Sequence, residues 1–533
     1  MSFAKNDSQQ ITLDDSCNRL TQREQKHLEK SWAKYFADYI FPNIDEERFR
    51  VLYSKKDSRP NTPVNVILGG LMLKEMFGMS DEEFMETLMF DVRFQYALHT
   101  SSYEEQPISD RTFGRFRQRC NSYETETGKD LIREAVEELS QQFAKMMKIS
   151  GSVKRMDSMM VASNIKRMSR LELLYTCVSN MVQELEKASV ELPETLKHYT
   201  EKDDLNKVIY HAKSENVDTR IQTVLSEAKE VKELCGSDYD KSSNYQLLLR
   251  VLREQTNQDG EGNYILKEKA DHAMNSQILQ NPADPDATYR SKAGKQNRGY
   301  VANIVEDVSE KNSIVTMYQF EQNTYSDSKF TKDTVEKLGK QETPVTLVAD
   351  GAYGGQKNEE YAKENNIELV STDLVGRKPK EILADFEMNE DGTSVLHCPA
   401  GYSPKSCSYN EKEEKINMSF RKEHCENCPF KDQCNPREYT RTYKVSISKK
   451  SQQRAKQFRR RQSEEFKQLS NIRNGAETVP SYLRRKYNVD RMPVRGLQKC
   501  KMYFGLKLCA SNIKKFCRYM QDMIDDAMSP VMA

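Results

Sequence analysis

Three acidic residues far apart in the chain, Asp157, Asp350 and Glu477, stand where a carboxylate can do chemistry. Asp157 follows Lys154-Arg-Met, and Asp350 ends the run Val345-Thr-Leu-Val-Ala. Short apolar and β-branched runs of this kind are typical of buried strands that deliver a side chain to the edge of a sheet. Carboxylates gathered from such distant points repel one another unless Mg²⁺ or Mn²⁺ neutralises them. The three acids therefore predict a divalent-metal site for phosphoryl transfer on nucleic acid.

The blocks around these acids resemble those of a known family. Asp157-Ser158, Ala349-Asp350-Gly-Ala-Tyr353 and Arg473-x3-Glu477 are similar, in this order, to the acidic blocks of bacterial insertion-sequence transposases of the DDE class. The resemblance covers roughly residues 60 to 520. It implies a cut-and-paste DNA transposase that cleaves element ends with Mg²⁺ or Mn²⁺ and joins the 3′-hydroxyl to target DNA. The implied partners are double-stranded DNA with terminal inverted repeats and a second protomer, in a synaptic homodimer.

The segment around Glu477 departs from the family pattern Tyr-x2-Arg-x3-Glu-x6-Lys. The Arg473 spacing is kept, but Ser470 replaces the Tyr and Arg484 replaces the Lys. Pro480 is expected to disturb a helix that runs through this site, because proline removes a donor and clashes with the preceding turn. Two other functions stay open for this reason: a DNA-binding protein of the same fold that has lost catalysis, or a nuclease that cuts without joining.

Glu464 and Glu465 are alternative third acids, because Arg460 and Arg461 precede them by four residues. Their downstream cation positions are Asn471 and Ile472, and this mismatch favours Glu477. We expect Asp157, Asp350 and Glu477 to hold the catalytic metal. Arg473 is expected to position a phosphate or a carboxylate.

Five of the twelve cysteines fall in one stretch, which predicts a structural zinc site. Cys425-x2-Cys428 supplies the tight loop that brings two thiolates to one ion, and Cys434 follows closely. Cys398 is the preferred fourth ligand, with Cys407 and His424 as alternatives. The resembling transposases often carry such a Cys-rich insert before the glutamate. The remaining cysteines are scattered and are expected to be small core residues.

Charge is distributed unevenly along the chain, although the formal net charge is only +1. Between Arg441 and Arg518 there are 22 Lys and Arg against four acids. Such an excess repels itself unless a polyanion is bound, and it predicts a DNA-binding face around the third acid. Arg473 and Arg484 lie within this segment, and both are expected to contact DNA.

A second predicted DNA contact lies near the N-terminus. In Ser109-Asp-Arg-Thr-Phe-Gly-Arg-Phe-Arg-Gln-Arg-Cys120, the apolar positions form one stripe of a helix. Arg111, Arg115 and Arg119 line another face at four-residue spacing. A buried face behind a row of arginines suits a recognition helix, and the resembling transposases carry a similar block in an N-terminal helical domain. An ordinary amphipathic helix remains the alternative.

The order of expected elements predicts an α/β fold, a ribonuclease-H-like mixed sheet flanked by helices. Its strands are expected near Asp157, at 299–306, at 313–320, before Asp350 and at 367–371. Asp284 and Asp286 are read as turn residues, with metal binding as the lesser alternative. The expected domains are an N-terminal helical DNA-binding domain at 1–145, a catalytic core at 150–164, 284–380 and 445–520, a helical insertion at 165–283 and a zinc-binding insertion at 381–440.

Residues 1–60 hold few periodic apolar positions apart from the stretch Trp32–Phe41, and they are expected to form a short helix and a flexible approach. No apolar run approaches the ~20 residues that span a bilayer, and the N-terminus lacks the apolar stretch of a signal peptide. We therefore expect a cytoplasmic, nucleoid-associated protein with reduced cysteines. The role of the helical insertion cannot be read from its residues.

Overall fold

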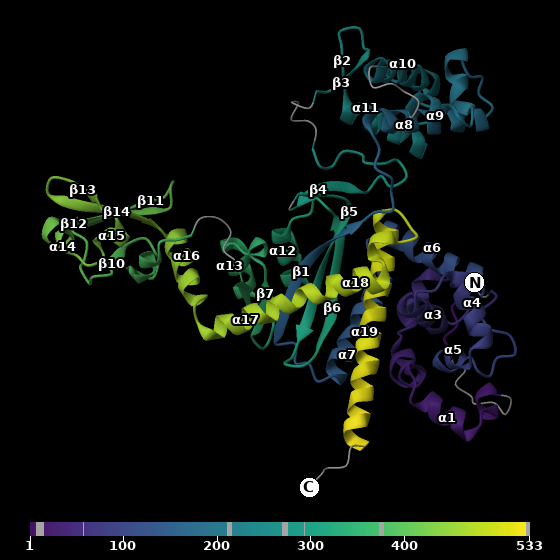
Figure 1. Ribbon diagram of the computed structural model, residues 1–533, viewed down its shortest axis with the longest axis horizontal. Helices are drawn as coiled ribbons and strands as arrows, with labels where there is room; N and C mark the ends of the chain where they lie inside the picture. Colours follow the sequence, from purple (N-terminus) through teal and green to yellow (C-terminus); the bar gives the residue numbers. More distant parts are fainter. Residues whose placement is uncertain are drawn as a thin grey trace.

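A mixed sheet lies at the centre of the computed structural model, which describes residues 1–6, 15–56, 58–209, 216–268, 275–292, 294–372 and 378–528. Helices cover both faces of this sheet, and two smaller lobes extend from it (Figure 1). The strands of the sheet are β1 (Val153–Ala162), β4 (Thr288–Lys292), β5 (Lys295–Val308), β6 (Ser313–Gln322), β7 (Val345–Ala349) and β8 (Ile367–Ser371).

The strand order is β6-β5-β1-β7-β8, and β4 pairs with the first part of β5. β5 runs antiparallel to β1 and β6, whereas β7 runs parallel to β1 and β8 runs parallel to β7. The five strands expected from the sequence are thus confirmed, and 367–371 has the expected bounds. β4 was not expected, because its residues Thr-Tyr-Arg-Ser-Lys are largely polar and carry no strand pattern.

Alternate residues of the strands pack on opposite sides of the sheet, as the pleat requires. Met156 and Val305 belong to a core shared with α12 (Asp327–Leu338) and α13 (Gln356–Glu364). Met159 and Ile304 belong to a second core, which includes α7 (Leu131–Met146) and α19 (Leu497–Met528). Because both faces are covered, the middle of β5 is buried throughout.

The N-terminal region is helical and shares the second core with the sheet. Its helices are α1 (Gln22–Glu29), α2 (Trp32–Tyr35), α3 (Val64–Phe77), α4 (Asp81–Phe90), α5 (Val92–Ala97), α6 (Asp110–Thr127) and α7. The short helix expected at 32–41 is present in part as α2, and Phe36 and Phe41 after it are buried in that core. The expected flexible approach is wrong at Phe49, which is buried there too. These aromatic residues lie in π and 3₁₀ turns, which leave no helical periodicity in the sequence.

The helical insertion between β1 and β4 forms one of the two lobes (Figure 1). It has a hydrophobic core of its own. Its elements are α8 (Arg170–Lys187), α9 (Asp204–Ile209), α10 (Val217–Cys235), α11 (Ser243–Gln255) and the hairpin β2 (Thr256–Gln258) with β3 (Tyr264–Leu266). Ser163 and Asn281 stand at its two ends. The Asn281 side-chain amide donates to the Lys166 carbonyl at 3.0 Å. This bond joins the segment that enters the insertion to the segment that leaves it.

The Cys-rich lobe holds a four-stranded antiparallel sheet. Its order is β11-β12-β14-β13, and it runs to Ser448, past the expected end of the insertion at residue 440. Its elements are β9 (Glu387–Met388), β10 (Val395–His397), β11 (Ser406–Asn410), β12 (Lys415–Arg421), α14 (Lys422–Glu426), α15 (Lys431–Cys434), β13 (Arg437–Glu438) and β14 (Thr442–Ser448).

Four helices lead from this lobe back across the sheet to the N-terminal helices (Figure 1). They are α16 (Lys449–Arg460), α17 (Glu464–Asn474), α18 (Thr478–Tyr487) and α19. The path matters for the site, because α17 contacts β1 and β7 while α19 contacts both β6 and α3.

Candidate active site

Asp157 and Asp350 come together because their strands are parallel neighbours. Arg155 of β1 pairs with Val348 of β7, so two residues further along each strand Asp157 lies level with Asp350. Asp350 directly follows β7 and begins a 3₁₀ turn, η7 (Gly351–Tyr353), where its Oδ1 accepts from the Gly351 amide at 2.6 Å. The two carboxylates predicted from the sequence therefore meet at one point of the sheet.

Arg473 of α17 lies among all three predicted acids. Its Nη2 is 3.9 Å from Asp157 Oδ2 and 3.8 Å from Asp350 Oδ2, and its Nη1 is 3.1 Å from Glu477 Oε1. The Arg473 side chain is only 16% exposed, and its Nε is a buried donor without a hydrogen-bond partner in the described part of the chain. One buried cation thus balances three carboxylates that would otherwise repel each other.

Glu477 lies at a break between two helices. α17 ends at Asn474, a 3₁₀ turn η9 (Gly475–Glu477) follows, and α18 begins at Thr478. Pro480 is therefore in the first turn of α18, where proline needs no hydrogen-bond partner, and the expected interruption of the helix is observed. Glu477 is 70% exposed, unlike the two aspartates.

Glu464 and Glu465, the alternative acids, lie at the other end of α17. Glu464 pairs with Lys467 at 3.0 Å, and Glu465 lies 3.8 Å from Arg460. Glu477 is joined to Asp157 and Asp350 through Arg473, which favours Glu477 as the third acid.

Burial raises the pKa of Asp157 above its ordinary value, and the negative charge of Asp350 adds to this effect. Arg473, the Ser158 amide and Lys292 act in the opposite direction without cancelling it. A buried carboxylate that is reluctant to ionise alone favours a cation beside it. Oxygen donors of this kind are the ligands that Mg²⁺ and Mn²⁺ prefer.

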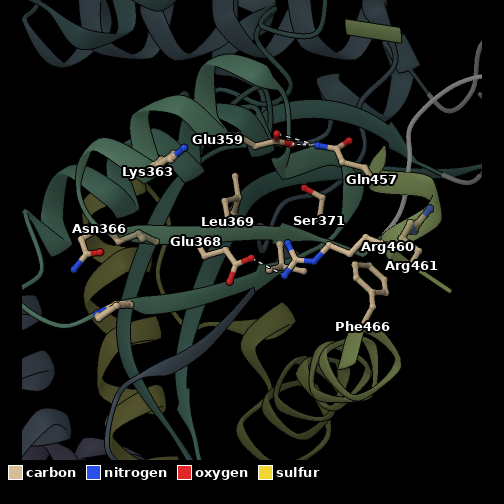
Figure 2. A pocket seen from close by; sticks show the side chains of 13 residues that line it. Glu359, Lys363, Asn366, Glu368, Leu369, Ser371, Gln457, Arg460, Arg461 and Phe466 are labelled. Atoms are coloured by element: carbon tan, nitrogen blue, oxygen red, sulfur yellow. Dashed lines mark hydrogen bonds and ion pairs between the residues drawn. The ribbon is translucent and has the colours of Figure 1, made fainter. Parts of the chain in front are cut away.

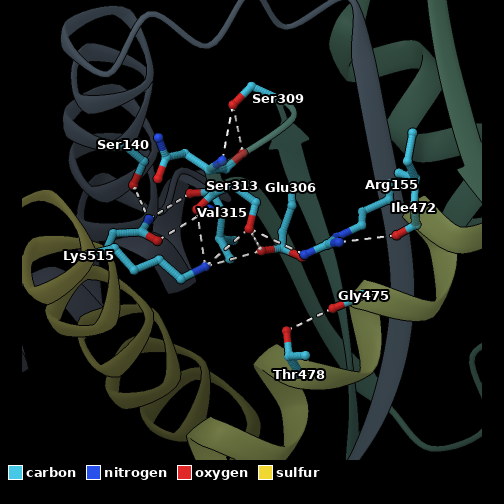
Figure 3. Close-up of polar contacts among 12 residues, drawn as sticks. Ser140, Arg155, Glu306, Ser309, Ser313, Val315, Ile472, Gly475, Thr478 and Lys515 are labelled. Atoms are coloured by element: carbon cyan, nitrogen blue, oxygen red, sulfur yellow. Dashed lines mark hydrogen bonds and ion pairs between the residues drawn. The ribbon is translucent and has the colours of Figure 1, made fainter. Parts of the chain in front are cut away.

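Sequence reasoning missed residues that support the site from behind. Ser158 donates from its hydroxyl to Asp327 Oδ1 at 3.0 Å, and Asp327 lies 3.8 Å from Arg290. Arg155 reaches from β1 to the end of α17, where its Nη1 donates to the Ile472 carbonyl at 3.1 Å (Figure 3). Ser158 and Arg155 flank Asp157 in the sequence, but no role was assigned to either of them.

Asp284 and Asp286 are structural, as the turn interpretation predicted. Asp284 is fully buried and accepts from the Tyr300 hydroxyl at 2.6 Å, from the Gly496 amide and from the Ser163 hydroxyl. Asp286 accepts from the Leu497 amide at 3.0 Å. Both carboxylates therefore accept hydrogen bonds from backbone amides at the start of α19. A negative charge is favourable there, because the N-terminal end of a helix carries partial positive charge.

The predicted DNA-contacting arginines differ in their surroundings. On α6, Phe113, Phe116 and Cys120 are buried as expected, while Arg111 and Arg115 are exposed. Arg119 is half-buried, with its guanidinium over the Tyr53 ring at 5.1 Å. Arg484 is 44% exposed and donates to the Met160 carbonyl at 2.7 Å and to Asp490 at 3.1 Å.

A cavity of about 420 Å³ runs along β8, at the edge of the sheet, between α13, α16 and α17 (Figure 2). Glu368 and Arg460 form an ion pair of 2.7 Å across it, and Glu359 accepts from Gln457. None of the three predicted acids lines this cavity. Part of the basic segment is thus neutralised internally, since Arg459 likewise pairs with Asp385.

The four preferred cysteines line one small cavity of the Cys-rich lobe, together with His424. Burial raises the pKa of the Cys425 thiol to about 11, and the charges of Cys398 and Cys428 contribute. The same causes raise the pKa of Cys434 to about 11. Cys407 is exposed on β11 and does not line the cavity, so the structure favours Cys398 over Cys407 as the neighbour of the other three.

Within the described residues, no group of three or more His, Cys, Asp or Glu side chains is arranged so that it could hold a metal ion as it stands. At the acid site, the positive charge beside the carboxylates is the Arg473 guanidinium. In the Cys-rich lobe, the four thiols line a cavity. None of the described helices is long and apolar enough to cross a membrane.

Comparison with known proteins gives two matches to protein families. Residues 22–119 match the family described as "Transposase domain (DUF772)", which covers α1 to most of α6. Residues 397–517 match the family described as "Transposase DDE domain", which covers the four cysteines, Arg473 and Glu477. Asp157 and Asp350 lie outside both matched segments. No curated protein and no solved structure matches the chain. The two family matches indicate an insertion-sequence transposase of the DDE class.

Proposed function

We propose that this transposase cleaves DNA at the ends of its insertion sequence and transfers the released 3′-hydroxyl to target DNA. The observation that carries the proposal is the meeting of Asp157, Asp350 and Glu477 around Arg473. The strand order supports a ribonuclease-H-like core, with the first acid on the central strand β1 and the second after its parallel neighbour β7.

Asp157, Asp350 and Glu477 would hold the Mg²⁺ or Mn²⁺. The donor set fits, because it consists of carboxylates that already accommodate a positive charge. When bound, the metal activates a water or a 3′-hydroxyl and stabilises the leaving oxygen. Arg473 orients the carboxylates and, with its remaining hydrogen-bonding capacity, positions a DNA phosphate.

DNA would be bound by two separate surfaces. The exposed Arg111 and Arg115 of α6, with Arg119 beside them, contact the terminal inverted repeats, and Arg484 contacts a phosphate near the acids. A homodimer would hold two ends together in the synaptic complex. Its place of action would be the bacterial cytoplasm, at the nucleoid.

The Cys-rich lobe would carry a structural zinc ion held by Cys398, Cys425, Cys428 and Cys434. The gathering of four thiols about one cavity supports this ligand set. Zinc would favour the thiolate forms that burial alone disfavours in Cys425 and Cys434.

The test incubates purified protein with labelled DNA carrying the gene's own flanks and a target plasmid, with Mg²⁺ or Mn²⁺. The Asp350→Asn variant is measured in parallel. Metal-dependent end cleavage and joined product, both lost in the variant, are expected. Cleavage without joining would point to a nuclease, and binding without cleavage under either metal would point to a DNA-binding protein that has lost catalysis.

A further inference from the structure

Arg155 connects four elements that surround the candidate active site (Figure 3). Its Nε donates to Glu306 of β5 at 2.6 Å, its Nη2 donates to the Ser313 hydroxyl of β6 at 3.2 Å, and its Nη1 donates to the Ile472 carbonyl of α17 at 3.1 Å. The side chain is only 9% exposed. A planar guanidinium makes three such bonds in fixed directions, which a lysine cannot do.

The other end of this network is equally well defined. Glu306 is buried, and its second oxygen accepts from Ser313 at 3.0 Å and from Lys515 of α19 at 3.3 Å. The guanidinium is therefore held from behind by the sheet, and its Nη1 is directed at the helix. The bond to Ile472 therefore fixes the end of α17 relative to the sheet.

The spacing along both partners places this bond beside the acids. Arg155 and Asp157 are two residues apart on β1, so their side chains emerge on the same face. Ile472 and Arg473 are consecutive at the end of α17. Arg155 thus binds Ile472, and the next residue, Arg473, is the one that approaches Asp157.

Gly475 shows how closely the helix end approaches Arg155. A Cβ atom at this position would lie 2.1 Å from Arg155 Nη1. The backbone of Gly475 is in the ordinary right-handed helical region, so alanine would suit the local conformation better than glycine does. Among the described residues, the three atoms nearest to such a Cβ all belong to the Arg155 guanidinium.

We propose that Arg155 is a positioning residue for strand cleavage, which clamps the break between α17 and α18 to β1 and so holds Arg473 and Glu477 against Asp157. The effect on the reaction rate rests on the proposed function. The clamp itself does not, because it is defined by contacts within the chain.

Two variants of the full-length protein test the clamp from its two sides. Arg155→Lys keeps the positive charge beside Glu306 but loses the directed bond to Ile472. Gly475→Ala keeps Arg155 and displaces it. Arg250→Lys is the matched control. Arg250 also donates to a glutamate, Glu254, and to backbone carbonyls, those of Gln277 and Pro285, and none of these residues lies on α17.

Hydrogen exchange of the amides at 471–479 is measured without metal, and single-turnover end cleavage is measured with Mg²⁺. We expect both variants to exchange faster in this stretch while the rest of the sheet stays protected. Their cleavage rate should fall by about 10- to 100-fold, the usual effect of losing a residue that orients a metal ligand. The affinity for end DNA should stay unchanged, and Arg250→Lys should match wild type in all three measurements.

The double variant sharpens the test. Gly475→Ala should slow cleavage in the wild-type background and have little further effect on Arg155→Lys, because lysine has no Nη1 for the new methyl group to meet. Additive effects, unchanged exchange at 471–479, or a normal rate despite local loosening would each overturn the proposal. A wild-type protein that cleaves no DNA would overturn the proposed function instead, and the exchange data alone would then decide on the clamp.

Discussion

Asp157 lies level with Asp350 on neighbouring parallel strands, and one guanidinium approaches both carboxylates to within 3.9 Å. This relationship makes the two aspartates a single unit with a shared requirement for positive charge. It also ties them to a helix that arrives from more than 100 residues further along the sequence.

Replacing either aspartate should abolish cleavage and leave binding intact. We expect Asp157→Asn and Asp350→Asn to slow end cleavage by about 100-fold or more, because a bound metal contributes several kcal/mol of charge stabilisation. Glu477→Gln should behave in the same way. Glu464→Gln on α17 is the control, and a larger loss in this variant than in Glu477→Gln would move the third acid to Glu464.

Arg473 should compete with the metal for the carboxylates. We expect Arg473→Gln to bind Mn²⁺ more tightly, on the order of tenfold, because a nearby like charge is removed. Its cleavage rate should nevertheless fall, since the residue that orients the acids is lost. Calorimetric titration with Mn²⁺ in the absence of DNA provides the check, with Arg485→Gln as a control on α18. An unchanged Mn²⁺ affinity would contradict the competition.

The exposed arginines of α6 should set the affinity for element ends. We expect Arg111→Gln and Arg115→Gln each to weaken binding and to reduce the slope of log affinity against log salt by about one. Arg119→Gln should have a smaller effect, because its guanidinium lies over Tyr53. Fluorescence anisotropy over a salt series measures this, and equal slopes in all variants would mean that α6 does not contact phosphate.

Zinc content should depend on four cysteines and not on the fifth. We expect one zinc ion per chain by elemental analysis, lost in Cys425→Ser and Cys428→Ser and kept in Cys407→Ser. Loss of zinc should loosen β11–β14 in hydrogen exchange, because metal binding and folding are coupled in small metal sites. If elemental analysis finds no zinc in the wild type while hydrogen exchange shows β11–β14 fully protected, the zinc prediction is contradicted. The Cys-rich lobe would then be stabilised by its apolar core alone.

The helical insertion should lose stability as the pH rises. Burial works to lower the pKa of His198, but the carboxylates Asp204 and Glu227, at 2.7 and 3.3 Å, outweigh it and the pKa is raised. The stabilisation is therefore complete below the unfolded pKa of about 6.5 and is lost as the pH passes through the higher folded value.

Hydrogen exchange of α9 and α10 at about pH 5.5 and about pH 8.5 tests this prediction, after correction for intrinsic exchange. Protection should be greater at the lower pH in wild type and nearly equal in His198→Gln. Greater protection of wild type at the higher pH would contradict the prediction, because it would show that folding lowers the pKa of His198.

The sequence predicted the central strands well, because buried strands have a clear apolar pattern. The structure brings Asp157 and Asp350 side by side, and their catalytic role stays a prediction. The sequence could not predict that β1 and β7 are adjacent and parallel, since their pairing joins residues almost 200 positions apart. Arg155 gave no signal either. The proposed role of Arg155 depends on its bond to the backbone carbonyl of Ile472. Every residue has a backbone carbonyl, so the sequence does not mark this acceptor.

Other differences have the same physical origin. β4 is polar and depends on its pairing with β5, and the N-terminal aromatic residues are buried in irregular turns. Pro480 was informative because its effect is local, and the helix break that it indicated is observed next to Glu477.

The bond between Asn281 and Lys166 has a consequence for how this chain can change in evolution. The outgoing and returning ends of the helical insertion meet at one point, and the insertion packs around its own core. Segments between these two ends can be lengthened, shortened or exchanged without shifting β1 against β5. The insertion is therefore a self-contained unit, and its length can change while the sheet that carries Asp157 stays as it is.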